Sequence, residues 1–196
     1  MQARNHLFAG AAHMTLIVSS ANYVSAGGGS SLLTNIVGYW KFSEGSGTSV
    51  ADATGHNSAA TLSGSPTWTT GIIDDAVSYT VGSSQYCDLG AGSGLVCGAG
   101  SFSVNFWANN LSTAVSGFPV SSRSASGAAS SGFDFLAALG NTPGIGYPRV
   151  SDGTTIVNAA SGITYPTTGW VMISFVIDRG TNLLITYING THSGVD

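Results

Sequence analysis

The feature that most constrains the fold is a series of short runs in which apolar and polar side chains alternate. Phe102, Val104 and Phe106, for example, alternate with Ser103 and Asn105. This period of two is typical of a β-strand with one buried face, because successive side chains of a strand point to opposite faces of the sheet. No long stretch keeps the apolar spacing of an amphipathic helix. The sequence therefore predicts strands and no long helix.

Turn signals separate these runs. Gly, Ser and Pro cluster between them, and residues 181–188 lead into Asn189-Gly190. An Asn-Gly pair after a strand is a strong hairpin signal, because a type I′ turn needs positive φ at both central residues. Residues 171–177 are apolar on both sides apart from Ser174, as in a strand that is covered on both faces. These patterns predict an all-β fold, an antiparallel β-sandwich.

Charged side chains are scarce, at 7% of the 196 residues, and the polar surface depends on Ser, Thr, Asn and 28 glycines. This composition favours an extracellular or virion-surface protein over a cytosolic enzyme. Five basic residues are scattered along a chain of net charge -4. Binding to nucleic acid needs clustered Lys and Arg to neutralise phosphates, so we expect no nucleic-acid partner.

Residues 1–35 differ in character from residues 36–196, which we predict form one domain. The early part resembles a secretory signal, with an apolar stretch and a small-residue site at residues 24–26. The alternative is an uncleaved N-terminal arm with strand character at residues 15–18 and a Gly/Ser linker at residues 27–31. The apolar run is too short for a membrane span.

The order of several motifs resembles that of a known family. Residues 38–42 form an aromatic run, Gly-Tyr-Trp-Lys-Phe, which leads into a turn with Glu44 and an Asp-x-x-Gly-x-Asn loop at residues 52–57. Further motifs follow in the family's order: Trp68-x-x-Gly71, residues 76–79, 85–89 and 102–107, Gly169-Trp170, and residues 187–190. Residues 33–196 thus resemble the laminin-G-like jelly-roll domains of the concanavalin A-like lectin/glucanase superfamily, found in secreted bacterial proteins and phage tail or virion proteins. The resemblance implies a jelly roll.

One departure from the family concerns the last strands. Relatives continue past the Asn-Gly hairpin into C-terminal strands that pair beside the opening Tyr39-Trp40 strand, and these strands are missing before Asp196. A sandwich without them exposes unpaired backbone groups along an edge. Three explanations are open: the sequence is a fragment or a minimal domain, the N-terminal arm fills the place, or a neighbouring subunit supplies a strand.

No arrangement of residues indicates catalysis. A retaining glycosidase needs two carboxylates about 5–5.5 Å apart, and the glucanases of this superfamily hold theirs on one strand. Here Glu44 is the only glutamate, and Asp74 and Asp75 are adjacent, so that in a strand they would point to opposite faces. The sequence also lacks a Gly-x-Ser-x-Gly nucleophile motif. We predict that the protein is not an enzyme.

The resemblance also implies a structural calcium site. In similar domains the loop at residues 52–57 helps to bind Ca²⁺. Asp52, Gly55 and Asn57 could supply side-chain and backbone oxygens, the ligands that this ion prefers. The alternative is an Asx-turn, in which Asp52 and Asn57 bond to their own backbone.

Cys87 and Cys97 are candidates for a disulfide that would close a short loop. The alternative is two separate reduced thiols, because free cysteine packs as a small hydrophobic residue.

Aromatic residues are the remaining ligand candidates, because sugars stack on exposed rings. Trp68, Tyr147 and Tyr165 flank or follow loops that contain Gly or Pro, and we predict that they bind a ligand. The other three tryptophans are expected to pack in or against the sandwich.

Taken together, these patterns predict a non-catalytic adhesion or recognition module that binds cell-surface glycans, in a virion or a secreted protein. The alternative is a decoration or assembly subunit that binds neighbouring copies, as a homo-oligomer, through its N-terminal arm and an open edge strand, with no sugar ligand. Fold alone does not choose between the two, because function depends on sites carried by a fold.

Overall fold

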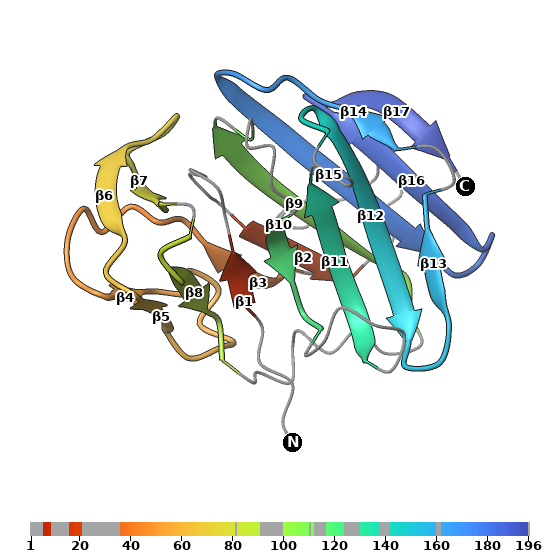
Figure 1. Cartoon of the computed structure of the whole chain (residues 1–196). Coiled ribbons are helices and arrows are strands. Elements are labelled where there is room, and N and C mark those ends of the chain that lie inside the picture. Colours follow the sequence, from red (N-terminus) through yellow and green to blue (C-terminus); the bar gives the residue numbers. More distant parts are fainter. Residues whose placement is uncertain are drawn as a thin grey trace, which may run out of the picture.

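The computed structural model describes residues 6–8, 16–20, 36–80, 82–90, 100–109, 111, 117–123, 130–137, 142–159 and 162–195. Within these residues all regular secondary structure is β-strand, and all paired strands run antiparallel (Figure 1). The prediction of an all-β antiparallel fold is confirmed. The described part of the chain has no helix of the length and apolar character that a membrane crossing requires.

The first of two large sheets, sheet A, includes strands from both halves of the chain. Its strands are, in spatial order, β13 (Ile156–Asn158), β12 (Ile145–Asp152), β11 (Ser131–Ala137), β10 (Gly117–Ser121), β1 (His6–Phe8), β8 (Tyr86–Asp88), β5 (Ala60–Ser63) and β4 (Ser49–Val50). The short strand β14 (Ile163–Thr164) also pairs with β12.

The second large sheet, sheet B, contains the longest strand, β15 (Trp170–Asp178). Its order is β17 (Thr191–Val195), β16 (Leu183–Ile188), β15, β9 (Phe102–Asn109), β2 (Leu16–Ser20) and β3 (Ile36–Trp40). A separate hairpin is formed by β6 (Thr67–Thr70) and β7 (Asp75–Ser78), and it lies at the left of Figure 1, above β4 and β5 of sheet A.

Aromatic side chains from the two sheets meet between them. The rings of Phe133 in β11 and Phe175 in β15 have centroids 6.0 Å apart, and those of Phe135 and Phe106 are 5.5 Å apart. All four side chains are buried, with edge-on or tilted ring geometry of the kind that aromatic pairs prefer. The predicted alternation holds in β9, where Phe102, Val104 and Phe106 face the core. The two sheets therefore share one hydrophobic core.

The tryptophans that were expected to pack in or against the sandwich differ in position. Trp40 in β3 is fully buried in the core. Trp107 in β9 and Trp170 in β15 alternate with core residues, so they lie half-buried on the face of sheet B that points away from sheet A. Met172 faces the same way, which means that β15 is less completely covered than its apolar sequence predicted.

Two strands of the N-terminal segment lie inside the sheets. β2 pairs with β3 on one side and with β9 on the other, and β1 pairs with β8 and β10. This pairing corresponds to the explanation in which the N-terminal segment fills the place beside the Tyr39-Trp40 strand. The signal-like site at residues 24–26 and the Gly/Ser linker at residues 27–31 lie outside the described residues.

Candidate functional site

The predicted metal loop is a closed network of hydrogen bonds around Asp52. Its carboxylate accepts from the backbone N–H of Tyr39 (2.8 Å), Thr54 (3.0 Å) and Asn57 (2.9 Å), from Thr54 Oγ1 (2.6 Å) and from Asn57 Nδ2 (2.9 Å). Partial burial raises the pKa of Asp52, but the hydrogen bonds from Thr54, Tyr39 and Asn57 outweigh this and lower it to about 2. Asp52 is therefore ionised at neutral pH, and its carboxylate is the acceptor to which the rest of the loop bonds.

This arrangement does not fit a calcium ion. Both Asp52 oxygens already accept hydrogen bonds, and Asn57 Nδ2 donates to Asp52 Oδ2 and to Val37 O (2.8 Å). Because both of these partners are acceptors, the amide must present its nitrogen to them. Gly55, at φ +72°, closes the turn by donating its N–H to Asp52 O. The geometry agrees with the Asx-turn alternative, and the described residues contain no group of three or more His, Cys, Asp or Glu placed to hold a metal.

The same loop caps the outer edge of β3, the last strand of sheet B. Tyr39 donates its N–H to Asp52 Oδ1 and accepts at its carbonyl from the N–H of Ala53 (2.7 Å), and Val37 O accepts from Asn57. The Tyr39-Trp40 strand, beside which the sequence predicted an open edge, is therefore covered on both sides. β2 pairs with one side, and on the other the loop bonds the N–H and carbonyl of Tyr39 and the carbonyl of Val37.

The three aromatic residues predicted to bind a ligand do not come together. Trp68 is half-buried against the core and donates its Nε1–H to Gly47 O (2.9 Å). Tyr165 is only 3% exposed and packs against Phe135, so it presents no face to a ligand. Tyr147 is half-buried on β12. Tyr147 in β12 and Tyr165, directly after the paired strand β14, lie close together, but Tyr165 is in the core, and Trp68 lies in the separate β6–β7 hairpin, so the three form no shared site.

Cys87 is buried in the core, and burial raises the pKa of its thiol well above the ordinary value. Cys97, its predicted disulfide partner, lies outside the described residues. The pairing therefore stays a prediction.

A pocket lies where the tip of the β6–β7 hairpin meets sheet B. We call it the sheet B pocket, and its volume is about 130 Å³. Its lining residues are Tyr39, Lys41, Ser43, Ile72, Ile73, Asp74, Asn105, Phe106, Trp107 and Met172. An engineered cavity of about 150 Å³ holds one benzene molecule, so this pocket accommodates about one six-membered ring.

Strand register explains why the floor of the pocket is aromatic and polar. Tyr39 in β3 and Asn105 in β9 both pair with Ile17 of β2, so the side chains of Tyr39 and Asn105 lie on the same face of the sheet. Trp107 pairs directly with Met172 on the same face. Since β2 runs between β3 and β9, the N-terminal segment supplies the strand that joins the two sides of this floor.

The charged side chains at the pocket have opposite signs. Lys41 places its Nζ 5.8 Å from the centroid of the Tyr39 ring, within cation–π range. Asp74 lies in the hairpin tip at φ +57°, where its carbonyl accepts from the N–H of Gly71 (2.9 Å). The pocket thus combines two aromatic rings, an amide and one charge of each sign around a space for one small ring.

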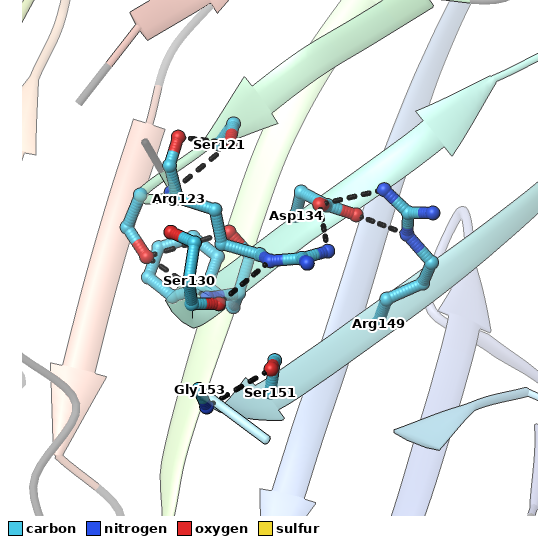
Figure 2. Close-up of polar contacts among 9 residues, drawn as sticks. Ser121, Arg123, Ser130, Asp134, Arg149, Ser151 and Gly153 are labelled. Atoms are coloured by element: carbon cyan, nitrogen blue, oxygen red, sulfur yellow. Dashed lines mark hydrogen bonds and ion pairs between the residues drawn. The ribbon is translucent and has the colours of Figure 1, made fainter. Parts of the chain in front are cut away.

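A second cluster of charged residues lies on the face of sheet A that points away from sheet B (Figure 2). Asp134 Oδ2 accepts from Arg123 Nη1 (2.8 Å) and Arg149 Nη2 (2.8 Å), while Asp134 Oδ1 accepts from Arg149 Nε (2.6 Å). Arg149 also lies over the ring of Phe118, at 5.2 Å. Arg123 and Asp134 are almost fully buried. These groups use their hydrogen-bonding capacity on one another, so the cluster is a structural feature rather than a site.

Sequence reasoning missed the sheet B pocket, although two signals pointed to it. The alternation that buries Phe106 must turn Asn105 and Trp107 to the opposite face. Ile72-Ile73 is an apolar pair in a turn, directly before Asp74. Comparisons of the chain with protein-family models, with curated proteins and with solved structures found no match.

Proposed function

We propose that the protein is a non-catalytic carbohydrate-binding module and that the sheet B pocket holds one sugar ring. The observation that carries the proposal is the combination of Tyr39, Trp107 and Asn105 on one face of sheet B, beside a pocket of about 130 Å³. Aromatic rings offer flat apolar faces to the C–H groups of a sugar, and amide and carboxylate groups bind its hydroxyls. Lys41 and Asp74 balance each other, which favours a neutral polyol over an anion.

The carboxylates near the pocket support binding without hydrolysis. Glycosidases of the retaining and inverting classes use a pair of carboxyl groups, whereas Asp74 is the single carboxylate among the described residues that line the pocket. Glu44 follows the lining residue Ser43 but does not itself line the pocket, and its carboxylate accepts from the N–H of Ala51 (2.9 Å). The proposed role is therefore recognition or adhesion.

The proposed setting is a virion surface or the extracellular space, and the proposed fold family is the laminin-G-like jelly roll of the concanavalin A-like superfamily. Support comes from the low content of charged residues and from the motif order between residues 33 and 196. The antiparallel two-sheet architecture is compatible with this kinship. Function still depends on the pocket, because one fold hosts many functions.

A glycan array followed by calorimetric titration tests the proposal. Trp107→Ala removes the larger aromatic face, and we expect binding to weaken by about tenfold or more, since a well-packed aromatic contact of this size is worth roughly 1.4 kcal/mol. Trp170→Ala is the matched control, because Trp170 lies on the same face of sheet B but does not line the pocket. Equal losses in both variants, or no glycan bound by the wild type, would contradict the proposal.

The alternative role, a structural assembly subunit, is favoured by one observation. Both sheets incorporate strands from the N-terminal segment, which a neighbouring copy could supply as donor strands. Analytical ultracentrifugation over a range of protein concentrations tests this role. Self-association of a protein that binds no glycan would favour assembly, and a monomer at all concentrations would exclude it.

A further inference from the structure

Two exposed isoleucines at the hairpin tip are not explained by the packing of the fold. Ile73 is 74% exposed and Ile72 is 43% exposed, and both side chains line the sheet B pocket. Side chains of this type are usually buried. Because they are adjacent and face a pocket, they form an apolar wall that a ligand could cover.

The turn holds this wall in place. β6 and β7 pair from Thr67↔Ser78 to Thr70↔Asp75, and the Gly71 N–H donates to the Asp74 carbonyl (2.9 Å). The two isoleucines therefore occupy the corner positions of a closed, hydrogen-bonded turn. Met172 adds a further apolar group on the sheet side of the pocket.

The composition of the pocket restricts the chemistry of its ligand. Lys41 and Asp74 are the charged groups of the lining. Their opposite charges add up to zero, which favours a ligand without net charge. A plain hexose would use the aromatic floor and the polar groups but would leave the isoleucine wall uncovered. A group that carries both a methyl and an amide would use the apolar wall together with the carboxylate of Asp74 and the amide of Asn105.

From this combination, and resting on the proposed function, we infer that the sheet B pocket selects a neutral sugar with an N-acetyl group, of the N-acetylhexosamine class. The ring stacks on Trp107 and Tyr39. The acetyl methyl packs on Ile72 and Ile73. The acetamide N–H donates a hydrogen bond to the carboxylate of Asp74, and the side-chain amide of Asn105 donates one to the acetamide oxygen.

The test is a calorimetric or NMR titration of the full chain with four free sugars: N-acetylglucosamine, glucose, glucosamine and fucose. We expect N-acetylglucosamine to bind about tenfold more tightly than glucose, because it gains an apolar contact and amide hydrogen bonds. Ile73→Ser should weaken N-acetylglucosamine about fourfold, as expected for one lost methyl contact of roughly 0.8 kcal/mol. The same variant should weaken glucose binding less than N-acetylglucosamine binding, because a plain hexose leaves the isoleucine wall uncovered.

Val157→Ser is the matched control, since Val157 in β13 is 51% exposed and does not line the pocket. Both variants change exposed side chains, so neither should prevent folding. Glucose or glucosamine binding as tightly as N-acetylglucosamine would overturn the inference while leaving carbohydrate binding intact. Fucose binding equally well would overturn it too, because a methyl group without an amide would then suffice. Failure of all four sugars together with an empty glycan array would overturn the proposed function itself.

Discussion

The polar groups on the outward faces of the two sheets have opposite surroundings. On sheet A, Asp134 lies between Arg123 and Arg149 and all three are engaged in ion pairs shielded from water. On sheet B, Tyr39 and Trp107 lie half-buried at a pocket. The face with more charge is therefore the one whose charged groups pair with one another and are shielded from water. A concentration of charge thus identifies a structural network here, whereas the candidate site is marked by aromatic and amide groups beside empty space.

The Asp52 loop extends this comparison. By sequence it is the most site-like segment, with Asp, Gly and Asn at spacings that suit a metal. In the structure its carboxylate is saturated by five hydrogen bonds and caps the edge of β3. A carboxylate that already accepts this many bonds has little capacity for a ligand, so its role is to hold the loop and protect the edge.

The largest effect is expected from Asp134→Ala, which leaves the buried guanidinium of Arg123 and the partly buried one of Arg149 without their shared partner. Removing one member of a buried ion pair typically costs about 3–5 kcal/mol. We therefore expect the free energy of unfolding in urea to fall by an amount of this order. Asp152→Ala is the control, because Asp152 is exposed and accepts only from neighbouring N–H groups of its own turn.

A fall of less than about 1 kcal/mol for Asp134→Ala, close to what an exposed ion pair contributes, would show that the sheet A network is not closed as described. Sugar affinity in the folded fraction should be unchanged, since the network lies on the other sheet. A change in sugar affinity would contradict the distinction between a structural network on sheet A and a binding site on sheet B.

A smaller effect is expected from Asp52→Asn. The amide cannot accept all five hydrogen bonds and turns its own N–H₂ toward donors, so we expect a loss of about 1–3 kcal/mol at pH 7. The variant should also respond less to acid. The folded protein lowers the pKa of Asp52 from 3.8 to about 2, so it releases this proton more readily than the unfolded chain does. The resulting stabilisation is present above about pH 4 and is lost as the pH falls toward 2.

Urea unfolding at pH 7, 4 and 2 measures this dependence. The difference in stability between the wild type and Asp52→Asn should shrink as the pH falls, and the other carboxylates cancel because both proteins carry them. A constant difference across the three pH values would mean that the ionised form of Asp52 is not the acceptor to which the rest of the loop bonds.

Local sequence patterns predicted the parts of the fold that depend on neighbouring residues. The alternation of residues 102–107 predicted β9, and Asn189-Gly190 predicted the turn between β16 and β17. Burial of Phe102, Val104 and Phe106 also required Asn105 and Trp107 to face outward, so the alternation itself places Trp107 against the sandwich rather than in its core.

The sheet B pocket could not be predicted in the same way. It forms because the β6–β7 hairpin tip meets strands from residues 39, 105–107 and 172, and no local pattern encodes that contact. The same holds for Asp134 and Arg149, which meet only through the register of β11 against β12. The position of β2 between β3 and β9 likewise depends on pairing over long sequence distances.

The most direct test of the sheet B pocket is a ¹⁵N-indole NMR titration with N-acetylglucosamine, with the four tryptophan signals assigned by Trp→Phe variants. The account predicts that the Trp107 signal shifts in a saturable manner. The signals of Trp40, buried in the core, and Trp68, bonded to Gly47, should stay in place. Four unmoved signals at the highest sugar concentration, or a shift confined to Trp68 or Trp170, would contradict the claim that this pocket binds a sugar.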